Sequence, residues 1–280
     1  MTEADCIEWI RSAIGDTNGE LEPEVQSIAP WSPEAGLSDD FRRGRVFLAG
    51  DAAHTLYPTG GLGMNLGYHG VHNLVWKLAL VLRGALPASV LDSYEDERRP
   101  QADRTRRASV ENAGLAGDLY RAYATKGDIE AAGFNLRQYG NFEGLVLGGE
   151  YRSALCTAEA EPAPPVDNEL IDFVPLVRTG RRAPHVWLDE AQTESVLDHF
   201  GSQYVLLMAA PHDEANAAVE RLQASGLPMV ALKLPNRADV TDLYRADELV
   251  LVRPDGVIAA RLNPTLGDFA VALAAATAQP

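Results

Sequence analysis

The first half of the chain combines a short, continuously apolar run with a longer stretch in which apolar residues recur at helical spacing. The run from Val46 to Ala49 predicts a strand that is buried on both faces. It ends at Gly50 and Asp51, and a loop rich in glycine follows. We expect a helix to start near Asn65, because an Asn there can cap a helix N-terminus. The apolar positions of that helix are Val71, Leu74, Val75, Leu78, Val81 and Leu82.

The segments on either side of this stretch have weaker patterns. Residues 2–14 predict a helix that Thr2 caps and Gly15 ends, and residues 22–31 alternate weakly, as a strand does. Residues 89–119 predict a long, highly charged helix that Pro100 kinks or breaks. Because one helix and one strand cannot form a sheet by themselves, we expect the opening to be the tail of a domain whose earlier part lies outside this chain.

Beyond a proline-rich segment at 154–168, the pattern changes to short alternating strands and helices. We therefore predict two domains, residues 1–160 and residues 161–280, and an α/β fold for the chain. The strand–helix–strand–helix–strand order followed by a hairpin is typical of a thioredoxin-like layer, and the absence of CxxC indicates a structural role for it. Strands are expected at 186–188, 204–209, 229–234, 249–252 and 257–262, and helices at 193–200, 213–224 and 265–276.

Composition restricts the partners that the chain is expected to have. The 280 residues carry 40 acidic and 24 basic side chains, a formal net charge of −16, which argues against nucleic acid and anionic membranes. Cys6 and Cys156 lie far apart and form no CxxC, and no apolar run is long enough to span a bilayer. We expect a reducing, cytoplasmic location.

The region around Asp51 has the composition of a ligand site. A carboxylate that follows a buried strand lies where open parallel sheets bind ligands. The loop after it contains Pro58, Gly60, Gly61 and Gly63, and a backbone without side chains allows a flat ligand to approach closely. With a helix N-terminus behind the loop, the arrangement favours an anionic, ring-shaped ligand.

Four segments of the sequence resemble those of a known family. GRVFLAGDAAH at 44–54, PTGGLGMN at 58–65, NLVWKLALVLRG at 73–84 and LDSYEDERRP at 91–100 together resemble the second flavin motif of the FAD-dependent aromatic hydroxylases. These are single-component flavoprotein monooxygenases of phenols and aromatic polyketides. The resemblance covers nearly the whole chain, because many larger members also end with a redox-silent thioredoxin-like domain.

The resemblance implies a cofactor, a reaction and a set of binding residues. FAD would be the cofactor and NAD(P)H the reductant, with O2 and a small aromatic substrate as the other reactants. Asp51 matches the acid that binds the ribityl chain, and Pro58 matches the proline beside the reactive face of the isoalloxazine ring. The loop at the pyrimidine end of the flavin is matched by Gly61, Gly63, Met64 and Asn65. No catalytic residue is assigned.

Two departures from the family pattern affect this interpretation. Gly70 stands where the family has an acid after the helix start, and the sequence contains no GxGxxG for the ADP portion of FAD. We therefore expect the chain to be the C-terminal portion of such a monooxygenase, which needs a missing N-terminal half or a separate N-terminal FAD-binding polypeptide for full activity. Two alternatives stay open: a flavin-independent binding or cyclase-like protein, and an interaction module for a full-length hydroxylase.

Other candidate residues have plainer explanations. His69 and His72 lie one helical turn apart but lack nearby acidic or Cys partners, so we predict no metal site. His54 is expected to satisfy local backbone groups. The arginines at 98, 99, 104, 106 and 107 are expected to form a solvated face or to pair with Glu95, Asp96 and Glu97.

Overall fold

The computed structural model describes residues 2–126 and 140–262, with only the backbone described at positions 120 and 122–126. It contains two compact units, Met1–Pro33 and Glu34–Pro280. In the first unit the predicted helix is confirmed as α1 (Glu3–Ile14), capped by the Thr2 side chain and ended by Gly15 at φ 74°. The strand predicted at 22–31 is wrong: that segment is irregular and has no strand partner within its unit.

The apolar run before the glycine loop is more exposed than its sequence predicts. It contributes only β2 (Val46–Phe47), which pairs antiparallel with β1 (Arg42–Arg43). Val46 is 65% exposed, so the prediction of a strand buried on both faces is wrong. Within the described residues β2 has only one neighbouring strand.

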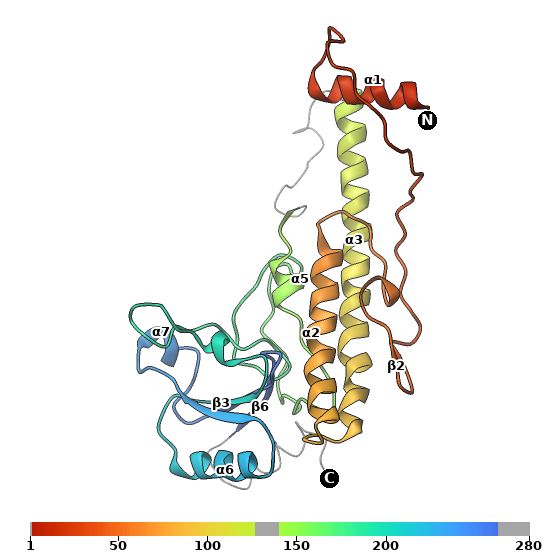
Figure 1. Cartoon of the computed structure of the whole chain (residues 1–280). Coiled ribbons are helices and arrows are strands. Elements are labelled where there is room, and N and C mark those ends of the chain that lie inside the picture. The colour runs from red at the N-terminus through yellow and green to blue at the C-terminus, as the bar shows by residue number, and fades with distance from the viewer. Residues whose placement is uncertain (1, 127–139, 263–280) are drawn as a thin grey trace. The chain divides into compact units, whose positions relative to one another are not determined.

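Two long helices lie side by side in the second unit (Figure 1). The first, α2 (Leu62–Leu82), begins three residues before Asn65, because Gly61 takes the left-handed conformation at φ 64° and acts as N-cap. The second, α3 (Ser93–Lys126), follows the short helix η2 (Ala88–Asp92). Pro100 lies inside α3 without breaking it. Asp96, whose carbonyl loses its helical donor, is exposed, so water can replace the missing N–H.

The C-terminal region forms a four-stranded sheet with the order β4-β3-β5-β6. Strand β3 (Tyr204–Met208) runs parallel to β4 (Met229–Lys233) and antiparallel to β5 (Leu249–Val252). The hairpin of β5 and β6 (Ile258–Leu262) and the helix α6 (Asp213–Ala224) agree with the sequence prediction. The strand–helix–strand order followed by a hairpin agrees with the later part of the thioredoxin-like order that the sequence indicates.

Several smaller elements of this region differ from the prediction. The strand expected at 186–188 is a single bridge between Trp187 and Ser195, and the helix expected at 193–200 is only the short 3-10 helix η4 (Val196–His199). The short helix α7 (Ala238–Thr241) was not predicted. The helix expected at 265–276 lies outside the described residues.

The helical pair and the sheet share one hydrophobic core. Trp76 and Leu80 of α2 pack with Tyr204 and Leu206 of β3, and the rings of Trp76 and Tyr204 meet edge to face with centroids 5.9 Å apart. The short helix α5 (Glu143–Leu147) packs near the start of α2 through the contact of Leu145 with Leu62. The division into domains 1–160 and 161–280 stays a prediction, and this core joins residues from both.

Candidate functional site

The glycine loop and the first turn of α2 form an open backbone surface. Gly60 and Gly61 have φ angles of 90° and 64°, which side-chain-bearing residues rarely adopt. No side chain caps the first turn of α2, and a Cβ added at Gly63 would meet nothing within 4 Å. Asn65 donates from Nδ2 to the carbonyl oxygen of Gly61 at 3.1 Å, which ties the loop to the helix. The helix N-terminus therefore presents free N–H groups and a positive dipole end.

Asp51 lies beside this surface in the one-turn helix η1 (Gly50–Ala52). The Cα atom of Gly50 is 3.8 Å from the position of a Cβ on Gly67, so η1 packs directly on α2. Asp51 is exposed, and its charge acts on the imidazole of His54. Burial and the charge of Arg98 nevertheless lower the pKa of His54. The sequence predicts that His54 satisfies local backbone groups, but its Nδ1 is buried without a hydrogen-bond partner.

The structure brings the predicted site residues to one end of α2. Pro58 accepts a hydrogen bond at its carbonyl from the N–H of Gly61, which closes the loop before the helix. Met64 is 69% exposed, so its apolar side chain does not contribute to the hydrophobic core. Asp51, Pro58, Gly61 and Asn65 are also exposed, and Gly63 is half-buried. None of these residues belongs to the buried core, so all of them are accessible to a ligand.

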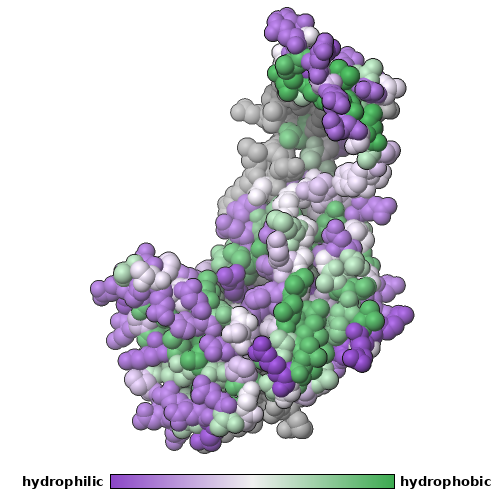
Figure 2. Space-filling model, in the orientation of Figure 1, coloured by the Kyte–Doolittle hydropathy of each residue, from purple (hydrophilic) through white to green (hydrophobic). Residues whose placement is uncertain are grey.

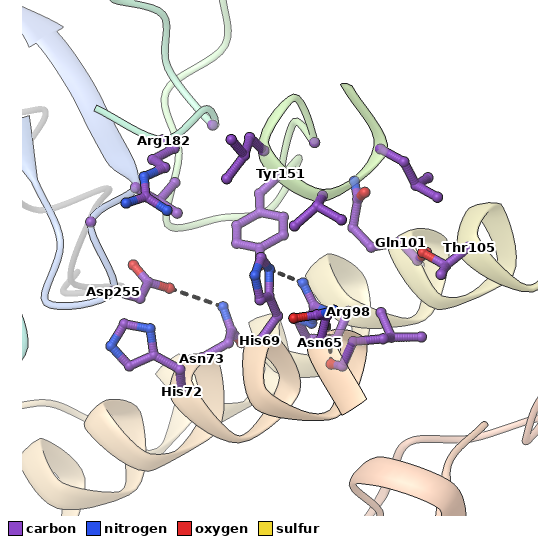
Figure 3. A pocket seen from close by; sticks show the side chains of 18 of the residues that line it. Asn65, His69, His72, Asn73, Arg98, Gln101, Thr105, Tyr151, Arg182 and Asp255 are labelled. Atoms are coloured by element: carbon purple, nitrogen blue, oxygen red, sulfur yellow. Dashed lines mark hydrogen bonds between the residues drawn. The ribbon is translucent and has the colours of Figure 1, made fainter. Parts of the chain in front are cut away.

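A cavity of about 320 Å³ lies further along α2, between this helix, α3 and the sheet layer (Figure 3). Only Asn65 of the predicted residues lines it. The polar lining comes from α2, from α3 and from the segments around Tyr151, Arg182 and Asp255, and Figure 3 shows these side chains around the cavity. These polar residues are Asn65, His69, His72, Asn73, Arg98, Gln101, Thr105, Tyr151, Arg182 and Asp255.

A buried ionic cluster forms the base of the contact between α2 and the sheet layer. Glu97 of α3 is 1% exposed and accepts hydrogen bonds from Lys77 at 2.8 Å and from both terminal nitrogens of Arg253 at 2.5 and 2.9 Å. Asp255 also pairs with Arg253, at 2.6 Å, and Asn73 donates to both acids. Burial raises the pKa of Glu97, but Arg253 and Lys77 outweigh it and hold that pKa well below its usual range. Burial lowers the pKa of Lys77 to about 8.

The prediction of a solvated arginine face is wrong for Arg98 and for Glu97, which are both buried. Arg98 is 3% exposed and donates to the hydroxyl of Tyr151 at 2.6 Å, while Glu97 turns to Lys77 and Arg253. Helical neighbours alone could not reveal this, because the partners of Glu97 are 20 and 156 positions away. For Arg106 and Arg107 the surface interpretation holds, with Asp103 as the partner of both.

Among residues 2–126 and 140–262, no three His, Cys, Asp or Glu side chains gather closely enough to bind a metal ion. Within the same residues, no helix is both long and apolar enough to cross a bilayer. Cys6 and Cys156 are both free thiols.

Comparison with known proteins connects this geometry to a family. Residues 1–109 match the FAD binding domain family, and residues 177–280 match the family described as aromatic-ring hydroxylase, C-terminal. A 4-methyl-5-nitrocatechol 5-monooxygenase from Burkholderia sp is 36% identical, over 98% of this chain and 50% of its own. A putative polyketide hydroxylase from Streptomyces halstedii is 33% identical, over 93% of this chain and 48% of its own.

A solved structure supports the same relationship. The ternary complex of aklavinone-11 hydroxylase with FAD and aklavinone superposes with a TM-score of 0.79 at 30% identity, over 99% of this chain and 51% of that one. The chain belongs to the family of FAD-dependent aromatic hydroxylases, and it spans about half the length of the curated relatives it matches.

Proposed function

We propose that this chain is the part of an FAD-dependent monooxygenase that holds the isoalloxazine end of the flavin. The observation that carries the proposal is the exposed, uncapped N-terminus of α2 behind a glycine loop, with Asp51 packed beside it through η1. This surface fits the flavin ring, because it offers backbone N–H groups and open space where side chains would obstruct a flat ligand.

Each residue of the loop has a distinct part in this proposal. Asp51 accepts hydrogen bonds from the hydroxyl groups of the ribityl chain. These hydrogen bonds fix the position of the ribityl chain, which joins the flavin ring to the phosphates. Pro58 would lie beside the reactive face of the ring, and Met64 would belong to the loop at its pyrimidine end. The backbone at Gly61 and Gly63, with Asn65 holding the turn, meets the pyrimidine end. The positive end of the α2 dipole favours the negative charge of the reduced ring by about 0.3–1 kcal/mol at an exposed site.

The proposed reaction hydroxylates a phenolic or aromatic polyketide substrate. NAD(P)H supplies two electrons, one oxygen atom of O2 enters the ring of the substrate, and the other leaves as water after proton uptake. When bound, the flavin supplies the electron transfer and the O2 activation. The substrate class follows from the relatives that are named polyketide hydroxylase and nitrocatechol monooxygenase. We propose the cytoplasm as the location, because both cysteines are free thiols.

The exposed face of α2 supports a second folded half beside this chain. Figure 2 shows a hydrophobic patch over α2. Its large apolar side chains are all substantially exposed although they recur at helical spacing, and they are Met64, Tyr68, Val71, Val75 and Leu82. We infer that a nucleotide-binding half carrying GxGxxG covers this face, either within a longer chain or as a separate N-terminal polypeptide.

A turnover assay tests this function. The chain is combined with a nucleotide-binding half from the same family, and NAD(P)H-dependent oxygen uptake is measured with an aromatic polyketide, with and without FAD. Uptake that requires FAD and both halves supports the proposal. Turnover that ignores FAD contradicts it and supports the flavin-independent binding or cyclase-like alternative. Tight binding to a full-length hydroxylase without turnover supports the interaction-module alternative.

A further inference from the structure

Arg98 is a buried cation to which the described residues supply no acidic partner. Its guanidinium donates to the hydroxyl of Tyr151 at 2.6 Å and to the carbonyl of Leu66 at 3.5 Å, and its Nε is buried without a partner. Arg253, within 5.6 Å of the same tyrosine ring, is by contrast paired with both Glu97 and Asp255. Burying a charge without a counter-charge costs free energy. The buried guanidinium of Arg98 therefore points to a ligand that supplies the missing negative charge.

The cavity that Arg98 lines is cationic, although the chain as a whole is strongly acidic. Arg182, an exposed residue without an ion pair in the described part of the chain, lines the same cavity. The acid that lines it, Asp255, is already neutralised by Arg253 at 2.6 Å. Burial, Arg98, Arg182 and His72 together lower the pKa of His69 to about 4, so this imidazole is neutral near pH 7. The cavity therefore has two cations available to an anion.

The remaining lining of the cavity is apolar and comes from opposite walls. Leu62 and Leu66 belong to α2, Leu145 and Val146 to α5, and Phe200 and Val257 to the sheet layer. A volume of about 320 Å³ is at the lower end of the range for small-molecule sites, which runs from about 300 to about 1,000 Å³. The cavity thus suits a small molecule that combines one anionic group with an apolar body.

We propose that the cavity between α2, α3 and the sheet layer binds a small aromatic carboxylate. The carboxylate accepts from the unpartnered Nε of Arg98, and Arg182 adds a second cation at the rim. The ring packs between the leucines of α2 and Phe200. This site shares only Asn65 with the flavin surface, since Asp51, Pro58, Gly61, Gly63 and Met64 do not line it. It needs no flavin.

Calorimetric titration of the 280-residue chain with 2-naphthoate, in the absence of flavin, tests the proposal. The neutral analogue 2-naphthamide has the same shape without the charge, and we expect it to bind at least about tenfold more weakly. Inorganic phosphate supplies charge without a ring and is also expected to bind at least about tenfold more weakly. Saturable naphthoate binding with both preferences supports the site. Equal binding of naphthamide or phosphate, or no saturable naphthoate binding, overturns it.

Variants locate the binding in this cavity. Arg182→Gln removes an exposed cation and leaves the fold intact, and it is expected to weaken naphthoate binding about tenfold without affecting naphthamide. Arg83→Gln is the matched control, because Arg83 is exposed at the far end of α2 and does not line the cavity. Arg98→Lys keeps the buried charge but loses Nε, and it should weaken naphthoate further. If Arg182→Gln and Arg83→Gln have the same effect, the proposal is wrong.

The imidazole of His69 gives an independent readout. Its NMR titration should move upward from about 4 when saturating naphthoate places a negative charge among the arginines. An unchanged titration with naphthoate bound would place the ligand elsewhere and overturn the proposal. Because none of these measurements contains flavin, their failure would leave the proposed flavin surface untouched.

Discussion

The two faces of α2 have similar apolar content and opposite environments. On one face Leu66, Leu74 and Trp76 are buried, and Lys77 reaches the ionic cluster at Glu97. On the other, residues such as Val75 remain exposed. The side chains of the buried face have packing partners, because α3 and the sheet layer supply them. Hydrophobic spacing therefore identifies a helix that will be buried. It does not show which of the segments that bury the helix belong to this chain.

The largest effect is expected from Glu97→Gln, which breaks the cluster on the buried face. Lys77 and Arg253 would lose their shared carboxylate while remaining fully buried. Removing one member of a buried ion pair costs about 3–5 kcal/mol. Urea unfolding measures the loss, and Glu111→Gln is the control, because Glu111 is an exposed acid on the same helix. A loss below that of the control would show that the cluster is unimportant for stability.

Adjacent truncations on the two faces sharpen the comparison. Leu74→Ala should destabilise the chain by about 2–5 kcal/mol, because Leu74 is buried between helices. Val75→Ala should change the unfolding free energy by less than about 0.5 kcal/mol, because Val75 is 53% exposed. Val75→Asp should leave the isolated chain folded and abolish its association with a nucleotide-binding half. Association that survives Val75→Asp would contradict the proposed covering of this face.

A smaller effect concerns pH and His69, at the edge between the two faces. The pKa of His69 is about 4 in the folded chain, against 6.5 for an unperturbed imidazole. The unfolded chain therefore binds one more proton between these values, and folding stability falls as the pH falls from 6.5 towards 4. His69→Gln should reduce this slope of the urea-unfolding free energy. An identical pH profile in the variant would show that the imidazole is not shielded as described.

The smallest predicted effect distinguishes two glycines. Gly70 has a helical φ, and a Cβ there would lie 3.8 Å from the hydroxyl of Tyr94, an ordinary contact. Gly70→Ala should therefore stabilise the chain by about 0.5–1 kcal/mol. Gly60→Ala should destabilise it, because φ is 90° and the Cβ would approach Phe142 to 2.7 Å. Thermal unfolding of both variants checks the opposite signs.

Local chemistry explains which parts of this structure could be predicted from the sequence. The cap at Thr2, the helix at 213–224 and the hairpin after Val252 depend on neighbouring residues, and the structure confirms them. The strand at Val46 was mispredicted because its burial depends on partners outside its own segment. The predicted start of α2 is three residues too late, because a left-handed Gly61 rather than Asn65 serves as N-cap.

Of the candidate sites, one could be predicted from the sequence and the other could not. The loop residues from Pro58 to Asn65 could be identified from one continuous motif, and their role in flavin binding stays a prediction. Arg98 could not be recognised, because its environment is made by Tyr151 and by a cavity wall that includes Arg182. Such a site forms only when α2, α3 and the sheet layer pack together, and a one-dimensional pattern contains no sign of it.

The central claim is that the start of α2 holds the ring and ribityl portion of a flavin but not its adenine end. Quenching of flavin fluorescence by the chain alone tests it most directly, with Asp51→Asn and, as control, the exposed Asp39→Asn. The account predicts that riboflavin and FAD bind with similar Kd, that ADP does not compete, and that only Asp51→Asn weakens binding. Competition by ADP, or equal effects of the two variants, would contradict it.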